Sequence, residues 1–467
     1  KLLNIYRSQH LGEEQFEILS ALTLGYKRGL DPEIKTVFSS SGAMHVLAVS
    51  GLHVGIIYGV LLFILGFLKR RKAGRLLFVL LTLFCLWAFA FITGLSPSVE
   101  RAATMFSLLV IGENLKRRIN VYNSLAASAM LLLLLNPNNL FEVGFQLSYA
   151  AVFGIVFLQP KLAKTIKVKT KVGRFFWVLL TVSIAAQLAT FPITLFYFNQ
   201  FPTYFWLANL LVIPAVSILI PLGLSLLIFA KLPFIATLLS AIINFLIQGI
   251  YLILKQIEQL PFSVFHASIQ PIELIFLLGL LLSLLFFLKQ PRTRYINTGL
   301  ICVLLLFISA TFLKATRLNE KEIIVYNYPD NTILQLINGK NNYVISEKEI
   351  EKNEYAHNLL RATGEKLHLE NPVYLTPSDT LINNHLFYES GIIIFGKQTI
   401  LFEHVPSDVP EQFTPDFIIN PKISNNSEWR TLKNSLVILN RSYISNTLLS
   451  PVRRYNVNQK GAFQKKW

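Results

Sequence analysis

Residues 42–59 read GAMHVLAVSGLHVGIIYG and open the first long apolar run of the chain, which continues to Leu68. The polar residues His45, Ser50 and His53 interrupt this run. A helix that faces lipid has no use for such side chains, because each polar group in hydrocarbon needs a hydrogen-bonding partner. We therefore predict that this helix faces other helices or a wet cavity.

Three glycines lie on one side of the same predicted helix. Gly51, Gly55 and Gly59 recur every four residues, a spacing that lets a second helix approach closely, and helix packing alone accounts for them. His45 and His53 are eight positions apart, about 80° around a continuous helix, so both can border one groove. A single buried histidine usually has its hydrogen bonds satisfied within the core of a protein. Two histidines on either side of a serine instead favour a functional site.

The composition indicates a protein that crosses a membrane many times. Of 467 residues, 53% are hydrophobic and 15% are charged, whereas soluble globular proteins are about 25% charged. Each apolar segment is close to the length of about 20 residues that a bilayer requires. We place ten spans at residues 44–68, 75–94, 98–115, 121–136, 140–159, 175–197, 203–230, 233–255, 272–288 and 296–313.

Cysteine usage and the first residue add two expectations. Cys85 and Cys302 lie far apart in separate apolar runs, so we predict neither a disulfide nor a metal site from them. The sequence begins with lysine rather than methionine, which predicts a fragment or a processed form.

Basic residues occupy alternate loops between the predicted spans. Lys and Arg number 18 in the loops at 69–75, 116–118, 161–174, 231 and 289–294, and none occur near 95–97, 137–139, 198–202 and 256–271. The positive-inside rule makes the first set cytoplasmic. It follows that the N-terminal segment and everything after about residue 315 are predicted to lie on the outer side. The same rule accounts for most of the net charge of +17 without any nucleic acid.

The two ends of the chain are polar. Residues 1–41 predict two short amphipathic helices at the membrane surface, one from Glu13 to Lys27 that ends near Gly29 and one started by Asp31-Pro32. Residues 318–467 predict a separate water-soluble α/β domain, with 16 basic and 16 acidic residues in balance and a helix from Glu347 to Ala362. Short strands are predicted at 323–326, 332–337, 343–345, 391–395, 399–402, 417–419 and 436–439.

Arg101 lies in the first turn of the span that follows Gly94 and Pro97. A cation is unfavourable at a helix N-terminus and costly in hydrocarbon. In one interpretation Glu100 neutralises the charge, or the side chain extends to the outer surface. In the other, Arg101 is a fixed positive charge at the outer mouth of a pathway, able to hold a phosphate.

Polar side chains also share a face of the next long helix. Glu142, Gln146 and Tyr149 follow the turn at Asn136-Pro137 at positions i, i+4 and i+7. Polar groups on one side of a spanning helix favour the interior of a bundle.

Gln187 and Asn209 belong to a block that also contains Pro192, Pro214 and Pro221. Prolines interrupt helices at many transport sites, although simple kinking accounts for them equally well.

These motifs together resemble the ComEC-type competence family, whose members are inner-membrane proteins that pass single-stranded DNA into bacteria. The likeness covers residues 12–290 in four blocks in the family's order: MHVLAVSGLHV at 44–54, a Pro-Ser followed by Arg-Ala at 97–102, VGFQLSY at 143–149 after an Asn-Pro turn, and residues 187–221.

The resemblance implies a mainly α polytopic membrane protein in which residues 42–315 form a channel for single-stranded DNA in the bacterial inner membrane. Such a passage requires water, cations for phosphates, and amide or aromatic groups that accept every base. Our candidates for the transport pathway are His45, Ser50, His53, Arg101, Gln146, Tyr149, Gln187 and Asn209. The implied partners are single-stranded DNA, the bilayer, an outer DNA receptor or pilus component, and a cytoplasmic helicase. We expect no cofactor and no enzymatic activity.

Fuller members of the family carry an N-terminal oligonucleotide-binding domain, which has no counterpart in this sequence, and a C-terminal metallo-β-lactamase-like domain. Residues 323–346, with a hairpin at Asn338-Gly339, and residues 455–463 resemble the start and end of the latter. A two-metal hydrolase needs clustered His and Asp ligands. The histidines in this part are well separated: His357, His368, His385 and His404. We predict a degenerate domain without metal.

The sequence is also compatible with two other functions. A small-solute or lipid transporter would use interrupted helices equally well. An intramembrane serine hydrolase would use Ser50 as nucleophile and His53 as base, although positions i and i+3 leave little room for a substrate.

Overall fold

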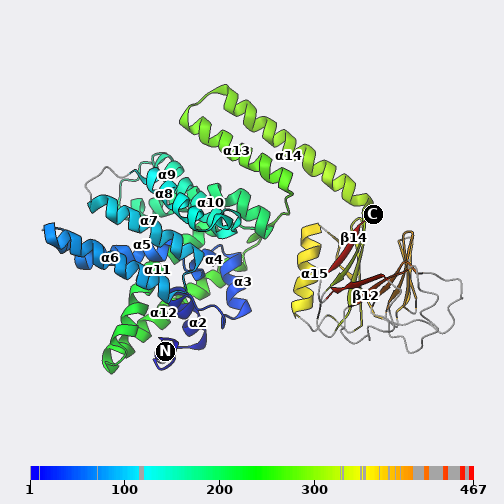
Figure 1. Ribbon diagram of the computed structural model, residues 1–467, viewed down its shortest axis with the longest axis horizontal. Helices are drawn as coiled ribbons and strands as arrows, with labels where there is room; N and C mark the ends of the chain where they lie inside the picture. Colours follow the sequence, from blue (N-terminus) through cyan, green and yellow to red (C-terminus); the bar gives the residue numbers. More distant parts are fainter. Residues whose placement is uncertain are drawn as a thin grey trace. The chain divides into compact units, whose positions relative to one another are not determined.

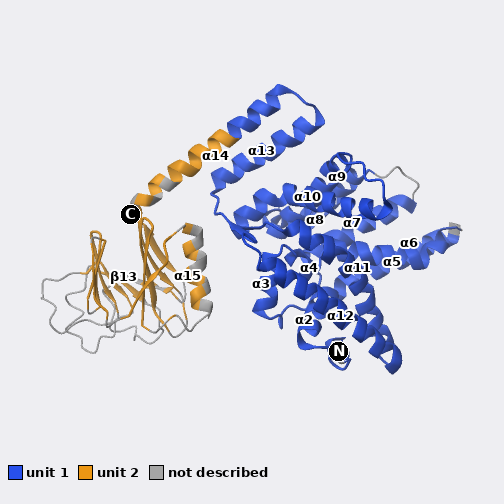
Figure 2. Cartoon of the chain, turned by 180° about the vertical axis from the view of Figure 1, so that it is seen from behind, with its two compact units in different colours: residues 1–302 blue, residues 303–467 orange. Residues whose placement is uncertain are grey.

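The computed structural model of the chain divides into two compact units, residues 1–302 and residues 303–467, which are described separately (Figure 2). The residues whose structure is described are 2–9, 11–70, 72–114, 120–326, 328, 331–347, 350, 354–367, 369–376, 379–383, 385–389, 391–402, 415–419, 435–439, 453–457 and 462–466.

Unit 1 is a bundle of α-helices (Figure 1). Its elements are α1 (Leu2–Arg7), α2 (Glu13–Leu24), α3 (Pro32–Ser40), α4 (Met44–Leu47), α5 (Gly51–Leu65), η1 (Gly66–Arg70), α6 (Lys72–Ile92), α7 (Pro97–Asn114), α8 (Val121–Leu135), η2 (Pro137–Phe141), α9 (Val143–Ala163), α10 (Lys171–Phe198), β1 (Gln200–Pro202), α11 (Phe205–Phe229), α12 (Pro233–Glu258), β2 (Val264–His266) and α13 (Pro271–Lys289). The last helix, α14 (Thr293–Asn319), begins in unit 1 and continues into unit 2.

Eight helical stretches among the described residues are long and apolar enough to cross a membrane, so the predicted polytopic helical fold is confirmed. They are Gly51–Arg70, Ala73–Ile92, Val143–Ala163, Lys171–Phe198, Phe205–Phe229, Pro233–Glu258, Pro271–Lys289 and Thr293–Leu313. The other two predicted spans are also helices. They are not among the eight for two different reasons. α7 carries three charged residues, Glu100, Arg101 and Glu113. α8 is apolar but has only 15 residues, a length of about 22 Å at 1.5 Å per residue.

The N-terminal segment contributes to the core of unit 1. The seven residues Ile18–Leu24 of α2 are all buried, and α2 packs against α11 and α12. The Tyr6 hydroxyl lies 3.0 Å from Thr23 Oγ1 and donates to the Gly223 carbonyl of α11 at 3.0 Å. α2 therefore does not lie on the surface as predicted, because its apolar residues pack between helices of the bundle.

Helix caps correct one predicted end and confirm one predicted start. α2 ends at Leu24 rather than Lys27, because Gly25 adopts φ +69° and its N–H bonds back to the Ala21 carbonyl. α3 begins as predicted, with Asp31 Oδ1 accepting from Glu33 N at 2.7 Å and Pro32 in the first helical position.

The prolines of α10 and α11 do not interrupt these helices. Pro192 lies inside α10, which runs for 28 residues, and Pro214 and Pro221 lie inside α11, which runs for 25 residues. The expectation of broken helices is therefore wrong. Packing on neighbouring helices holds both helices continuous across positions where proline removes a backbone hydrogen bond.

A two-stranded sheet joins two loops of unit 1. β1 and β2 are antiparallel, with Gln200 opposite His266 and Pro202 opposite Val264. The Gln200 amide also donates to Ser39 Oγ at 3.0 Å, so the N-terminal segment reaches the same loop. The pairing brings together two of the loops that lack basic residues, as expected if both lie on one side of the membrane.

The described residues of unit 2 form two sheets and one helix, in addition to the end of α14. A five-stranded sheet has the order β14-β3-β4-β5-β6, and a seven-stranded sheet has the order β13-β12-β11-β10-β9-β8-β7. The elements are β3 (Lys321–Tyr326), β4 (Ile333–Asn338), β5 (Asn341–Ser346), α15 (Glu354–Leu367), β6 (Val373–Leu375), β7 (Leu381–Ile382), β8 (Leu386–Glu389), β9 (Ile392–Phe395), β10 (Gln398–Phe402), β11 (Phe417–Ile419), β12 (Leu436–Leu439), β13 (Arg453–Asn456) and β14 (Phe463–Lys466).

Both faces of the five-stranded sheet are buried. Ile323 and Val325 of β3 join a core shared with the seven-stranded sheet, whereas Ile324 and Tyr326 join a second core with Ala356 of α15. The alternation of side chains along a strand produces this division. The predicted hairpin is confirmed, with a turn at Gly339 (φ +62°) and Lys340. The predicted helix is displaced, because α15 starts at Glu354 and continues through Gly364 to Leu367.

A buried polar network between the five-stranded sheet and α15 gives unit 2 a testable pH dependence. The Tyr326 hydroxyl bonds to Gln335 Oε1 and lies 2.9 Å from Thr363 Oγ1, and Gln335 Nε2 donates to Asn342 Oδ1 at 2.7 Å. Burial raises the pKa of Tyr326 to about 12, a shift that the Thr363 hydrogen bond opposes.

We expect unit 2 to lose stability in alkali through Tyr326. In the unfolded chain tyrosine titrates at about 10. The folded state keeps the neutral phenol, so its contribution is complete below pH 10 and declines as the pH rises toward 12. The loss should be of the order of 2–3 kcal/mol. Melting curves of the wild type and Tyr326→Phe between pH 9 and 12 measure it. Parallel declines in the two proteins would contradict the assignment.

Candidate functional site

The two predicted histidines lie on different helices. α4 ends at Leu47, Ala48 is extended (φ −82°, ψ 105°), and α5 starts afresh at Gly51. His45 is exposed on α4 with Nδ1 3.2 Å from the Gly42 carbonyl, whereas His53 is fully buried on α5. The predicted continuous helix, and with it the 80° relation, is wrong, because Ser50 caps a new helix between them.

Ser50 and His53 form the start of α5. The backbone N–H of Ser50 donates to His53 Nδ1 at 3.2 Å, and Ser50 Oγ lies 3.2 Å from the same nitrogen. Because Nδ1 accepts, the ring proton is on Nε2, a buried atom with no partner among the described residues. A reciprocal cap of this kind accounts for the Ser–His contact as helix initiation.

Two of the three glycines that were predicted to contact a second helix pack on α7. A Cβ at Gly51 would lie 3.5 Å from Ala102 Cβ, and one at Gly55 would lie 3.3 Å from Phe106 Cζ. At Gly59 nothing lies within 4 Å, so the close contact ends one turn earlier than predicted. α5 thereby lies beside the part of α7 that carries Arg101.

Arg101 is buried, with 4% of its surface exposed, between α7 and the first turns of α9. Its Nη2 donates to Ser148 Oγ at 2.8 Å, and a Cβ at Gly144 would come within 3.3 Å of Nη2. Its Nε is buried without a hydrogen-bond partner in the described part of the chain. The carboxylates of Glu100 and Glu142 attract the Arg101 charge electrostatically without direct contact. No ion pair to Arg101 forms among the described residues.

The position of this guanidinium is electrostatically unusual. Burying a cation costs several kcal/mol after relaxation, and an α-helix N-terminus carries a partial positive charge of about +0.5. Arg101 lies in the second turn of its own helix and beside Gly144, the second residue of α9. A buried cation close to the N-termini of two helices, with its Nε–H unused, is suited to accept an anion.

The neighbouring polar residues of α9 are bound to protein groups. The Tyr149 hydroxyl lies 3.1 Å from Ser128 Oγ of α8, and Gln146 Nε2 donates to the Leu140 carbonyl at 3.0 Å. The sequence prediction missed both serines that take part, Ser128 and Ser148. Ser148 stood inside the VGFQLSY motif, so the motif itself carried the signal for it.

Gln187 and Asn209 lie on other helices. Gln187 is half-buried on α10, where its carbonyl accepts from Thr190 Oγ1 at 3.3 Å. Asn209 on α11 has 8% of its surface exposed, and its Oδ1 is buried without a partner among the described residues. No described hydrogen bond joins either side chain to Arg101 or to His53.

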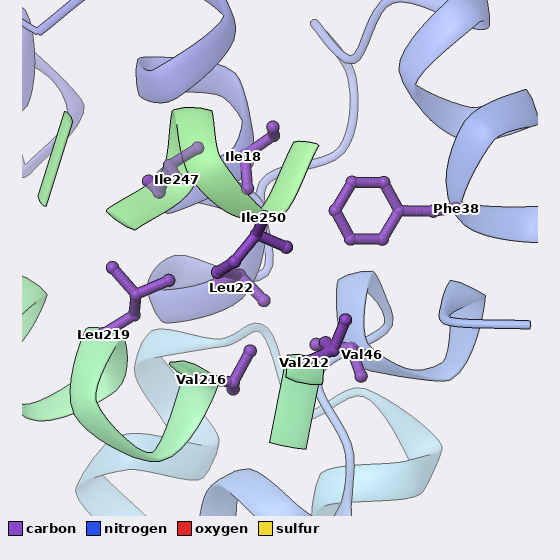
Figure 3. Close-up of a pocket in the computed structure, with 9 residues that line it drawn as sticks. All are labelled: Ile18, Leu22, Phe38, Val46, Val212, Val216, Leu219, Ile247 and Ile250. Atoms are coloured by element: carbon purple, nitrogen blue, oxygen red, sulfur yellow. The ribbon is translucent and has the colours of Figure 1, made fainter. Parts of the chain in front are cut away.

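The predicted site residues thus fall into two polar clusters, Ser50 with His53 and Arg101 near Gln146 and Tyr149, and three separate positions at His45, Gln187 and Asn209. Neither of the two cavities described in unit 1 is lined by any of them. The cavity in Figure 3 lies among α2, α3, α4, α11 and α12, and its volume of about 10 Å³ is close to that of one water probe. Its lining is entirely apolar: Ile18, Leu22, Phe38, Val46, Val212, Val216, Leu219, Ile247 and Ile250.

The histidines of unit 2 give no metal centre in the described residues, where no group of three His, Cys, Asp or Glu side chains is placed to hold an ion. His385 Nδ1 lies 3.0 Å from Asn338 Nδ2. His368 and His404 lie outside the described residues. The predicted degenerate, metal-free character of this unit stays a prediction.

The fold and these buried polar groups define a polytopic helical membrane protein with polar side chains inside its bundle. A family model described as "Competence protein" matches residues 22–292. The chain belongs to this competence protein family, as the motifs predicted.

Similarity to known proteins extends over part of their length. The chain is 33% identical over 298 residues to ComE operon protein 3 of Bacillus subtilis (strain 168), which is 62% of this chain and 37% of that protein. It is 35% identical over 130 residues to an uncharacterized protein of Aquifex aeolicus (strain VF5), 28% of this chain and 30% of that protein. No solved structure matches significantly.

Proposed function

We propose that the helical unit conducts single-stranded DNA across the bacterial inner membrane during natural transformation. Membership of the competence protein family supports a role in DNA uptake. The distribution of basic loops supports an orientation with the N-terminus and unit 2 on the outer side. An outer DNA receptor or pilus component would deliver the strand, and a cytoplasmic helicase would draw it in.

The single observation that carries the proposal is the buried guanidinium of Arg101. Intramembrane charges are costly and mark pathways for substrates and ions. A phosphodiester would bind the unused Nε–H together with the first turn of α9, which presents free backbone N–H groups. A phosphate contact is independent of base sequence, as a general uptake path requires.

The other candidate pathway residues would contact the bases of the strand, which phosphate contacts leave unbound. Tyr149 offers an aromatic face next to Phe145, with ring centroids 4.4 Å apart, and Gln146 offers an amide. Ser50 caps α5 and His53 lies in its first turn, and α5 packs on α7, the helix that carries Arg101. Since no cavity described in unit 1 is lined by these groups, the proposal requires the helices to separate when a strand enters.

Gln146→Glu tests the path beside Arg101. A new carboxylate there should repel phosphates and lower DNA delivery to the cytoplasm about tenfold, equivalent to about 1.4 kcal/mol, with DNA binding at the cell surface unchanged. Gln146→Met, which also loses the bond to the Leu140 carbonyl, should retain most uptake. Gln290→Glu places the same charge on the exposed end of α13 as a control. Full uptake by Gln146→Glu would remove this residue from the path.

A further inference from the structure

A second cavity lies where η1, α6 and α7 meet, near the end of α7 opposite to Arg101. It has a volume of about 120 Å³, which is room for several water molecules. It is lined by Lys69, Arg75, Phe78, Val79, Val110, Glu113 and Asn114. None of these residues takes part in the proposed DNA path.

The charges around this cavity are not balanced. Lys69 Nζ lies 3.2 Å from Glu113 Oε2, which also accepts from the Tyr58 hydroxyl at 3.4 Å. Lys69 in addition stacks on Phe78, 4.5 Å from the ring centroid. Arg75 forms no hydrogen bond or ion pair with any described residue. One guanidinium charge is therefore left over at the cavity and is available to an anion.

The rest of the cavity is apolar. Phe78, Val79 and Val110 have exposed fractions of 1%, 7% and 1%. On the outer surface of α6 next to them, Leu76 and Leu80 are each 56% exposed. A cationic rim above an apolar floor, beside an exposed apolar helix face, fits an amphiphile with an anionic head.

We propose that this cavity binds the phosphate headgroup of an anionic phospholipid. Arg75 would hold the phosphate through its paired N–H groups, and the Asn114 amide would bind a second headgroup oxygen. The acyl chains would run along Leu76 and Leu80. A free phosphate would use the cation but not the apolar floor, so the lipid is favoured. The loop beside the cavity belongs to the set predicted to be cytoplasmic, where anionic lipids attract basic segments.

The test uses the full chain purified in a neutral detergent and titrated with phosphatidylglycerol, with bound lipid counted by native mass spectrometry. We expect Arg75→Gln to weaken binding about tenfold. Lys231→Gln removes an exposed cation from another loop of the same predicted set and should leave binding unchanged. Equal binding by the wild type and Arg75→Gln would overturn the proposal.

Two further measurements separate the lipid from other occupants. Glu113→Gln releases Lys69 toward the cavity and should strengthen phosphatidylglycerol binding about threefold. Phosphatidylcholine, which has the same phosphate but no net charge, should bind at least tenfold more weakly. Displacement of the lipid by millimolar inorganic phosphate would instead show that the cavity binds simple anions. Tighter binding of phosphatidylcholine than of phosphatidylglycerol would show that the cavity does not select an anionic headgroup, and would overturn the proposal.

Discussion

Replacing Arg101 with glutamine should reduce DNA delivery to the cytoplasm about 100-fold, which corresponds to about 2.7 kcal/mol of lost stabilisation for a strand in transit. The guanidinium is buried, contacts Ser148 through Nη2, and has Nε unused. A charge-assisted contact in such an environment is stronger than one in water. DNA bound at the cell surface should stay at the wild-type level, because the change lies within the bundle.

Arg101→Lys is the matched variant for the geometry of this contact. Lysine keeps the charge but presents a point charge in place of a planar fork, so uptake should fall about tenfold rather than 100-fold. Transformation frequency and entry of labelled DNA into the cytoplasm measure both variants.

The stability of the same variants separates a functional role from a structural one. The wild type buries a cation with incomplete partners next to two helix N-termini, so neutralising it should leave the melting temperature equal or higher. Lower uptake with unchanged melting supports a phosphate contact. A melting temperature that falls in proportion to uptake would instead assign Arg101 to the architecture of α7 and α9.

The second large effect concerns Gly154 in α9. A Cβ at this position would lie 2.3 Å from Ala189 Cβ and 2.7 Å from the Ala185 carbonyl of α10, both shorter than any real contact. Gly154→Ala should therefore force α9 and α10 apart and lower the free energy of unfolding by about 2 kcal/mol. Because Pro192 and Gln187 lie on the same helix as these alanines, uptake should fall as well.

Gly59→Ala is the matched control for this prediction. Nothing lies within 4 Å of a Cβ at Gly59 of α5, so the added methyl group meets no clash. Alanine is favoured over glycine within a helix by about 1 kcal/mol, and the control should melt at the same or a higher temperature. Thermal unfolding in one detergent compares the two. If both substitutions shift melting equally, the contact between α9 and α10 is looser than the structure shows.

Sequence patterns predicted the helices of unit 1 and the strands at the start of unit 2 well. Runs of about 20 apolar residues form helices because such segments satisfy their own backbone hydrogen bonds in lipid, and every predicted span is largely helical in the structure, with a break at 48–50 in the first of them. The hairpin at Gly339 was predictable because the turn needs a positive φ. The helix α15 was misplaced because burial against the sheet, rather than the glycine at 364, decides its end.

The site was predicted as a set of residue types rather than as contacts. Arg101, Gln146 and Tyr149 stood out as polar residues in apolar surroundings, which is a local property of sequence. Their partners Ser148, Ser128 and Leu140 come from packing and from turn geometry. Serines are frequent in helices for many reasons, so their type alone does not mark them.

The sequence by itself determined the class of the protein, its family, and the positions of its apolar helices. Only long apolar segments are stable in the hydrocarbon core of a bilayer, and such segments are visible in the sequence. The family motifs are likewise recognised by their residues and their order along the chain. Only the tertiary structure decided that His45 and His53 lie on separate helices, that α2 is buried, and that Arg101 keeps an unused N–H beside α9. The break between the two histidines depends on the backbone turn that Ser50 and His53 cap. The burial of α2 and the surroundings of Arg101 depend on contacts between residues that are distant in the chain, and a linear pattern does not record which helix faces meet.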